Sequence, residues 1–182
     1  MYRHQMRYER TAQHFFGSGY NVENLEKIVG GFACNDGVNK VRVVYDGSGI
    51  VSATCAPYQM KNVRNLRLVE CGGIEYKYKY DDRTVLDNAM SRRGGCDNVV
   101  IARNGVLTDT SYTNIALYDG NRWFTPAHPL LKGTALMRLL DEGILSERDI
   151  RVDTVWDYSY IALFNSMIDF GRLVLPTTCV VK

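Results

Sequence analysis

Residues 105–140 read GVLTDTSYTNIALYDGNRWFTPAHPLLKGTALMRLL, and this stretch decides the fold. Its short apolar runs are separated by Asp119-Gly120-Asn121 and preceded by Asn104-Gly105, which are typical of tight turns between antiparallel strands. The segment LLKGTALMRLLDEG has helical spacing, and Gly143 supplies its end. The stretch therefore predicts several short antiparallel strands followed by one helix.

The N-terminal part of the chain predicts two helices and a hairpin. Apolar residues lie near helical spacing in residues 3–16, and Gly17 is the expected stop. Asn21 is the expected N-cap of a second helix over VENLEKIV. The segments VNKVRVVYD and IVSATCAPY alternate apolar and polar residues around DGSG, which predicts two antiparallel strands joined by a turn.

The chain is expected to form two lobes of an α+β protein. Pro57 and the polar residues 59–65 interrupt the pattern, which indicates a small N-terminal α/β lobe, 1–60, and a larger lobe, 61–182. In the larger lobe, RLVEC and IEYKYKY are strand-like, a helix is expected over 82–93, and IALFN and RLVLP are further strands. Helices in blocks separate from antiparallel strands indicate the α+β class.

Charge and composition exclude several classes of partner. Lys and Arg number 22 against 20 Asp and Glu, so attraction to nucleic acid or to anionic lipid should be weak. No run approaches the roughly 20 apolar residues that span a bilayer, and the opening MYRHQMRYER lacks the apolar stretch of a signal peptide. We therefore expect a cytoplasmic protein with neither nucleic-acid nor membrane partners.

Cysteine and histidine usage predicts no disulfide and no metal site. The cysteines are odd in number, widely scattered and without a CxxC pair, which favours reduced thiols. The histidines show no metal-ligand spacing. These residues are Cys34, Cys55, Cys71, Cys96 and Cys179, and His4, His14 and His128.

Lys79 is the first residue that could carry chemistry. In IEYKYKYDDR, Lys77 and Lys79 would share one face of a strand, with tyrosines on the other face. A lysine attacks carbonyl groups only where burial or a neighbouring cation lowers its pKa and leaves free amine. Two solvated lysines on an edge strand are the simpler interpretation of this segment taken alone.

Asp109 and Thr134 are two further candidates. Asp109 lies in a strand that otherwise enters the core, where a carboxylate needs a hydrogen-bonding partner, although a strand-end Asp is more often a turn or cap residue. Gly133 and Thr134 open the last helix, and the free amides and positive dipole end of a helix start favour an anion. Many helices begin this way for capping only.

Together these segments resemble the class IV aminotransferase family, the fold-type IV pyridoxal phosphate enzymes that include branched-chain and D-amino acid aminotransferases and aminodeoxychorismate lyase. The resemblance rests on an acid, an Asn five residues later, then Thr-Pro, then a Leu-x-Gly entry to a helix, in residues 105–140. It extends from about His4 to Ile168. It implies a two-lobed fold with an antiparallel-rich C-terminal lobe that binds pyridoxal 5'-phosphate, a small-molecule amino substrate, and a homodimer.

The resemblance assigns roles to individual residues. The lysine of the internal aldimine, which also carries the proton, falls on Lys79 rather than Lys77, because KYDDR resembles the family's lysine followed by Arg or Asn and then a helix. Asp109 matches the acid that pairs with the pyridine nitrogen, where most members have Glu. The remaining matches are cofactor-binding residues: Arg7 in HQMRYERT for the phosphate, Asn114 in the signature, and Thr134, Asn165 and Ser166 in two phosphate-binding turns.

Arg42 is a weaker proposal from the residues themselves. A strand arginine could bind a substrate carboxylate through two hydrogen bonds. An exposed hairpin arginine is the simpler interpretation.

The chain also departs from the family pattern in two places. It begins close to Arg7, so the strands that usually precede this arginine are expected to be missing from the small lobe, and Leu136 stands where an arginine is common. The expected activity is transamination or aminodeoxychorismate lysis, and Asn165-Ser166-Met167 resembles the lyase branch more. The alternative is a cofactor-binding or structural homologue without turnover.

Overall fold

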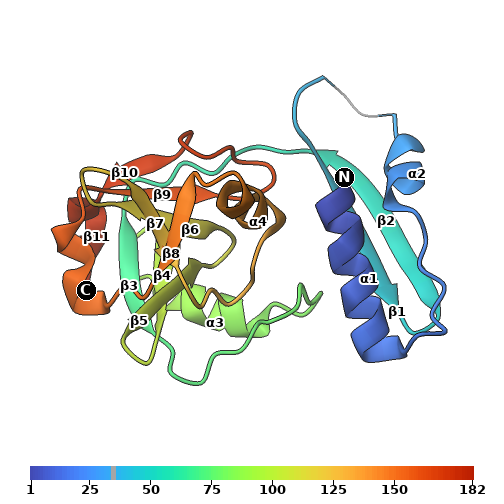
Figure 1. Ribbon diagram of the computed structural model, residues 1–182, viewed down its shortest axis with the longest axis horizontal. Coiled ribbons are helices and arrows are strands. Elements are labelled where there is room, and N and C mark those ends of the chain that lie inside the picture. Colours follow the sequence, from blue (N-terminus) through green and yellow to red (C-terminus); the bar gives the residue numbers. More distant parts are fainter. Residues whose placement is uncertain (34–35) are drawn as a thin grey trace. The chain divides into compact units, whose positions relative to one another are not determined.

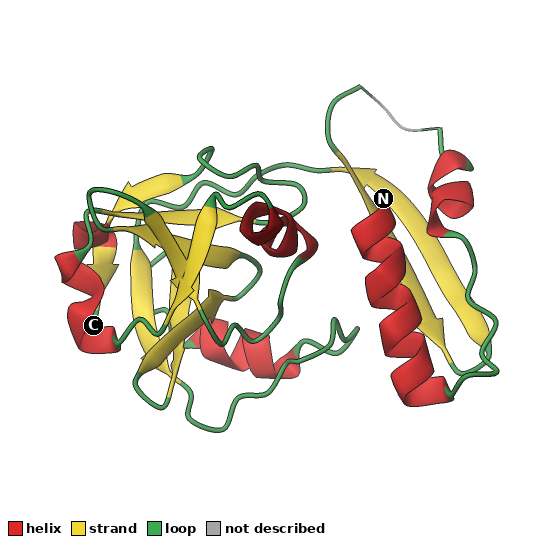
Figure 2. Ribbon diagram, viewed as in Figure 1, coloured by secondary structure: helices red, strands yellow, loops and turns green. Residues whose placement is uncertain are grey.

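The computed structural model describes residues 1–33 and 36–182, and the chain divides into two compact units, Met1–Met60 and Lys61–Lys182. Figure 1 shows the elements in chain order, and Figure 2 separates helices from strands. Each unit contains both helices and strands, which confirms the α+β class.

The small unit consists of a helix packed on a hairpin. Helix α1 (Tyr2–Phe16) ends at Gly17, whose φ of 85° lies in the region that favours glycine. Strands β1 (Asn39–Asp46) and β2 (Gly49–Pro57) pair antiparallel, as predicted. The rings of Tyr8 on α1 and Tyr45 on β1 lie 4.3 Å apart between centroids, so an aromatic contact joins the helix to the hairpin.

Helix α2 (Leu25–Gly30) begins later than the sequence predicts. The N-cap is Asn24, whose side-chain oxygen accepts hydrogen bonds from the amides of Glu26 and Lys27. The prediction of Asn21 as N-cap was therefore wrong. Both residues are asparagine, and only the backbone conformation decides which side chain reaches the free amides.

The large unit contains two sheets. A four-stranded sheet has the order β11-β3-β4-β5, and a five-stranded sheet has the order β10-β9-β6-β7-β8. The strands are β3 (Leu66–Glu70), β4 (Asn98–Arg103), β5 (Val106–Thr110), β6 (Asn114–Tyr118), β7 (Trp123–Pro126), β8 (Leu145–Arg148), β9 (Tyr160–Phe164), β10 (Val174–Pro176) and β11 (Val180–Val181).

Each sheet packs against one helix. Leu86 and Ala89 of α3 (Thr84–Ser91) join Val99 and Ile101 of β4 in one apolar cluster. Leu136 and Leu139 of α4 (Thr134–Asp141) join Ala116 of β6 and Phe164 of β9 in the other. Short 3-10 helices η1 (Val152–Asp157) and η2 (Thr177–Cys179) lie near the C-terminus, and η1 contains the predicted helical patch around Trp156.

The predicted strand over IEYKYKY is absent from the described part of the chain. Residues 74–80 are irregular, with Ile74 and Tyr76 buried and Lys77 exposed. Alternation indicates which side chains are buried but does not supply a neighbouring strand, and β3 already lies between β11 and β4. The short strands β8 and β11 were not predicted.

Two expectations about the rest of the chain can be compared with the structure. The described residues Cys55, Cys71, Cys96 and Cys179 form no disulfide, whereas Cys34 lies outside the described residues. None of the described helices combines the length and apolar character that crossing a bilayer requires.

Candidate functional site

Asp109 is a buried carboxylate near the end of β5. Its side chain accepts a hydrogen bond from Asn114 Nδ2 at 2.7 Å and one from the backbone amide of Leu131 at 3.0 Å. Only 5% of the residue is exposed. The acid is therefore held from two directions, by the next strand and by the loop before α4.

Burial raises the pKa of Asp109 to about 7. The hydrogen bonds from Leu131 and Asn114 and the more distant charge of Arg103 act in the opposite direction, because each stabilises the carboxylate. A further positive donor at this acid would favour its ionised form. The carboxylate has lone pairs for such a donor, since two oxygens accept about four hydrogen bonds.

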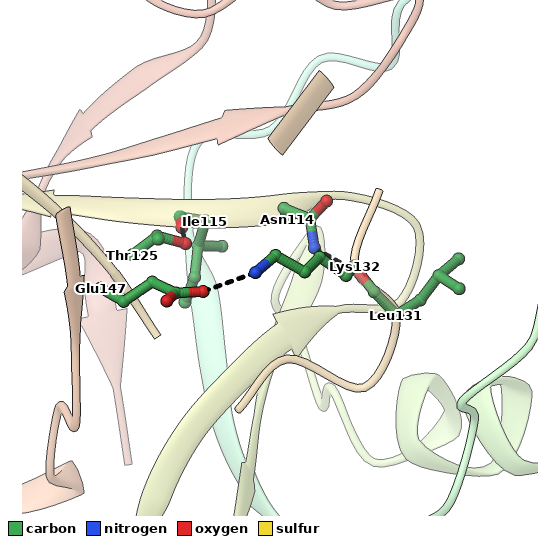
Figure 3. A network of polar contacts seen from close by, with 6 residues as sticks. All are labelled: Asn114, Ile115, Thr125, Leu131, Lys132 and Glu147. Carbon is green, nitrogen blue, oxygen red and sulfur yellow. Dashed lines mark hydrogen bonds and ion pairs between the residues drawn. The ribbon is translucent and has the colours of Figure 1, made fainter. Parts of the chain in front are cut away.

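Asn114 links the acid to the turn before α4. Its amide donates to Asp109 and also to the carbonyl oxygen of Leu131 at 2.8 Å, as Figure 3 shows for the second contact. A Cβ built on Gly133 would lie 2.3 Å from Asn114 Oδ1. Asn114 in its observed place therefore requires glycine at position 133, which gives a physical reason for the glycine of Leu-x-Gly.

Thr134 begins α4 directly after this glycine. Thr134 is buried, and the first turn of the helix carries no acidic residue, which leaves the helix start favourable to an anion. Lys132 Nζ lies 2.8 Å from Glu147 Oε1 on β8, an ion pair that also restrains the turn (Figure 3).

Leu136, at the position where the resemblance led us to expect an arginine, takes a structural role. Its side chain is fully buried in the cluster with Phe164. Arg138, two residues later, is paired with Glu142 at 2.8 Å on the outside of α4.

Asn165 and Ser166 form the turn that follows β9. Asn165 Oδ1 accepts hydrogen bonds from the amides of Met167 and Ile168, and its Nδ2 donates to the carbonyl oxygen of Tyr112 at 3.3 Å. Ser166 is exposed. Because Phe164 pairs with Asn114 across β9 and β6, this turn lies next to the asparagine that holds the acid.

Lys79 lies on the irregular segment before α3, and its side chain is exposed, as is that of Lys77. The predicted shared strand face does not exist. The segment is nevertheless tied to the acid's strand, because Arg83 Nη2 donates to the carbonyl oxygen of Ser111 at 2.7 Å. Ser111 belongs to the connection between Asp109 and Asn114.

The large unit thus gathers most of the predicted residues around one connection. Asp109 and Asn114 are in direct contact, and Asn165 itself donates to the carbonyl oxygen of Tyr112 between them. Thr134 follows the loop at Leu131 that contacts Asn114. Neither Arg83 nor the backbone of Leu131 had a predicted role. The position of Arg83 four residues after Lys79 could have pointed to this arginine. The Leu131 donor is a backbone amide, which the identity of the residue does not reveal.

Arg7 and Arg42 belong to the small unit. Arg7 lies on α1 with Nη2 3.4 Å from His4 Nδ1, and burial lowers its pKa. Thr11, the hydroxyl residue of the quoted motif, donates to the carbonyl oxygen of Arg7. Arg42 is exposed on β1. Within the residues that the structure describes, no group of three metal-ligating side chains occurs.

The sequence model of one protein family, amino-transferase class IV, matches residues 1–174. The chain therefore belongs to the class IV aminotransferase family. This family depends on pyridoxal phosphate.

Individual relatives cover nearly the whole chain. An uncharacterized protein of Haemophilus influenzae is 33% identical over 166 residues, 90% of this chain and 88% of that protein. The solved structure of a “putative 4-amino-4-deoxychorismate lyase” of Haemophilus somnus is 33% identical with a TM-score of 0.85, covering 92% of this chain and 89% of that one.

A “putative amino-acid aminotransferase” of Mesorhizobium loti has the same fold. Its TM-score is 0.79 at 22% identity, and the match covers 98% of this chain and 90% of that one.

Proposed function

We propose that this protein is a pyridoxal phosphate-dependent enzyme acting on a small amino compound, with Lys79 as its reactive amine. The observation that carries the proposal is the buried carboxylate of Asp109, held by Asn114 and by the loop that enters α4. In the family signature, these are the acid, the asparagine and the Leu-x-Gly segment, and here they form one set of contacts.

The donor set of the large unit fits this cofactor. A buried carboxylate with unused lone pairs suits a protonated ring nitrogen, whose positive charge would favour the ionised acid over the neutral form that burial favours. The start of α4 and the exposed hydroxyl of Ser166 suit a phosphate dianion. Pyridoxal phosphate, when bound, supplies an electron sink for charge that develops at the substrate's α-carbon.

The protein's own groups would perform the remaining work. Asp109 keeps the ring nitrogen protonated, and Asn114 fixes the orientation of the carboxylate that does so. Lys79 Nζ, as a general acid and base, removes the proton from the substrate's α-carbon and returns it to another carbon. Arg7 is the proposed phosphate ligand of the small unit, and Arg42 is the weaker proposal for a substrate carboxylate.

Aminodeoxychorismate lysis is our preferred activity within the family. The Haemophilus somnus protein, a “putative 4-amino-4-deoxychorismate lyase”, is 33% identical across nearly the whole chain, and Asn165-Ser166-Met167 resembles the lyase branch. In that reaction, aminodeoxychorismate yields 4-aminobenzoate and pyruvate. Transamination is the second candidate, supported by the fold shared with the Mesorhizobium loti protein.

Reductive labelling tests the cofactor and the lysine. Purified protein is mixed with pyridoxal phosphate, its visible spectrum is recorded, borohydride is added, and the labelled peptide is mapped. We expect a visible band that bleaches and a label on Lys79. Lys79→Ala should abolish the label, and Lys77→Ala, the matched control, should retain it. A protein that takes up no cofactor would instead support a structural homologue without turnover.

Two substrates separate the activities. The loaded protein with aminodeoxychorismate should release pyruvate if it is the lyase. Conversion of the bound cofactor to its amine form by an amino acid alone, with no pyruvate from aminodeoxychorismate, would identify an aminotransferase instead.

A further inference from the structure

The segment that carries Lys79 is shaped by the buried side chain of Tyr76. Tyr76 is 3% exposed, and its hydroxyl donates to the carbonyl oxygen of Tyr80 at 2.8 Å. The amide of Tyr80 donates to the carbonyl oxygen of Tyr78 at 3.0 Å, which makes a three-residue turn with Lys79 at its centre. The backbone around Lys79 is therefore fixed from within the core, although the lysine side chain is exposed.

Arg83 connects this segment to the strand of the acid. Its hydrogen bond to the carbonyl oxygen of Ser111 reaches the connection between β5 and β6, which has Asp109 before it and Asn114 after it. Ser111 is itself held, because its hydroxyl donates to Oδ1 of the fully buried Asn98 at 2.8 Å. Arg83 thus binds a rigid point of the large unit.

Tyr76 and Arg83 also interact with one another. Burial raises the pKa of Tyr76, and the positive charge of the nearby Arg83 guanidinium acts in the opposite direction. Of these two neighbouring side chains, Arg83 binds the Ser111 carbonyl and Tyr76 binds the Tyr80 carbonyl beside Lys79. The helix that follows Arg83 is anchored by buried Leu86.

We propose that Arg83 and Tyr76 are positioning residues for Lys79, which hold the turn at this lysine in a fixed register with the strand that carries Asp109. The inference rests on the proposed function of Lys79. It also gives a reason for Lys79 rather than Lys77 as the reactive amine, since Lys79 occupies the centre of the restrained turn.

The experiment compares Arg83→Met, Arg83→Lys and Tyr76→Phe with Arg93→Met. The last is a matched control, because Arg93 is exposed beyond the other end of α3. Two quantities are measured: amide hydrogen exchange of residues 76–83 in cofactor-free protein, and the rate of borohydride-trapped labelling of Lys79 with pyridoxal phosphate as a function of pH.

We expect Arg83→Met to increase exchange over residues 76–83 and to slow Lys79 labelling about 10- to 100-fold, because small displacements of a reacting group have effects of this size. The pH midpoint of labelling should shift with it. Arg83→Lys should recover part of the rate, since an ammonium can still donate to the Ser111 carbonyl. Arg93→Met should match the unchanged protein in both measurements.

An unchanged rate and pH profile of Lys79 labelling in Arg83→Met and Tyr76→Phe would overturn the inference. If Arg83→Met does not fold, Tyr76→Phe, which removes one oxygen atom, decides alone. Failure of the unchanged protein to label Lys79 would overturn the proposed function instead, and the two failures are thereby distinguished.

Discussion

Asp109 makes a pH dependence of folding predictable from a single residue. Burial raises its folded-state pKa to about 7, whereas an unfolded aspartate titrates near about 3.9. Between these pH values the folded chain binds more protons, so the free energy of unfolding falls as pH rises, by at most ~1.4 kcal/mol per pH unit. Urea unfolding of the cofactor-free protein from acid to neutral pH measures this slope.

The side chain introduced by Asp109→Asn cannot titrate. The free energy of unfolding of this variant should therefore fall less steeply as pH rises than that of the unchanged protein. Asp87→Asn on the exposed side of α3 is the matched control and should keep the slope. Identical slopes in the two variants would show that Asp109 does not hold its proton more tightly in the folded state.

Gly133 allows a second prediction at the level of one atom. The added Cβ of Gly133→Ala would lie 2.3 Å from Asn114 Oδ1, so the asparagine must move and its hydrogen bonds to Asp109 and Leu131 must weaken. We expect a loss of about 2 to 4 kcal/mol in the free energy of unfolding, measured by urea denaturation.

Two variants test this cause. Gly95→Ala should be nearly neutral, because nothing lies within 4 Å of its added Cβ. Combining Gly133→Ala with Asn114→Ala should cost less than the sum of the single changes, since the smaller side chain removes the clash. Strict additivity would refute the proposed contact.

The two signature residues were predictable to different degrees. The strand pattern left Asp109 open between a turn or cap residue, the commoner case, and a carboxylate that enters the core, and the structure buries it. The dependence of Gly133 on Asn114 was not visible, because it is a contact between a strand and a distant loop. Residue identity at either position alone does not encode such a contact.

Helix α2 shows what a cap contributes at the level of an element. Asn24→Ala removes the oxygen that accepts from the amides of Glu26 and Lys27 and should cost about 1 kcal/mol of helix stability. Faster amide exchange in residues 25–30 is the measurement. Asn21→Ala is the control and should leave exchange unchanged, whereas equal effects of both substitutions would contradict the assignment of Asn24 as the cap.

The strands illustrate how far periodicity predicts an element. The alternation of apolar and polar residues, together with turn residues, predicted β1, β2 and the strands from β4 to β7, because the two strands that each turn joins follow one another closely in sequence. The same alternation failed over residues 74–80, where Tyr76 is buried by α3 and β4 and its hydroxyl binds the backbone of Tyr80. A side chain that enters the core does not require its backbone to join a sheet.

At the scale of the whole molecule, the order of the strands within each sheet could not be predicted from local sequence patterns. Strand β8 returns through α4 to lie parallel to β7, and β11 adds to β3 from the C-terminus. Strand β8 has one buried residue, Leu145, and β11 has only two residues. Neither strand therefore contains the alternation of apolar and polar residues by which a strand is recognised in a sequence. The boundary between two lobes was predicted from Pro57 and the polar residues 59–65, and the family resemblance implied the same two-lobed architecture.

The two units should differ in their ability to fold alone. Both apolar clusters of the large unit are built from its own residues, whereas the described buried residues of the small unit are Tyr8, Thr11 and Ala12. A domain of about 60 residues buries only about 60% of its unfolded surface, which makes it marginal. We expect residues 61–182 to unfold cooperatively in urea and residues 1–60 to show no cooperative transition, both followed by circular dichroism. The full chain is the reference. A cooperative small unit, or a large fragment without a transition, would mean that the fold depends on contacts other than the clusters within each unit.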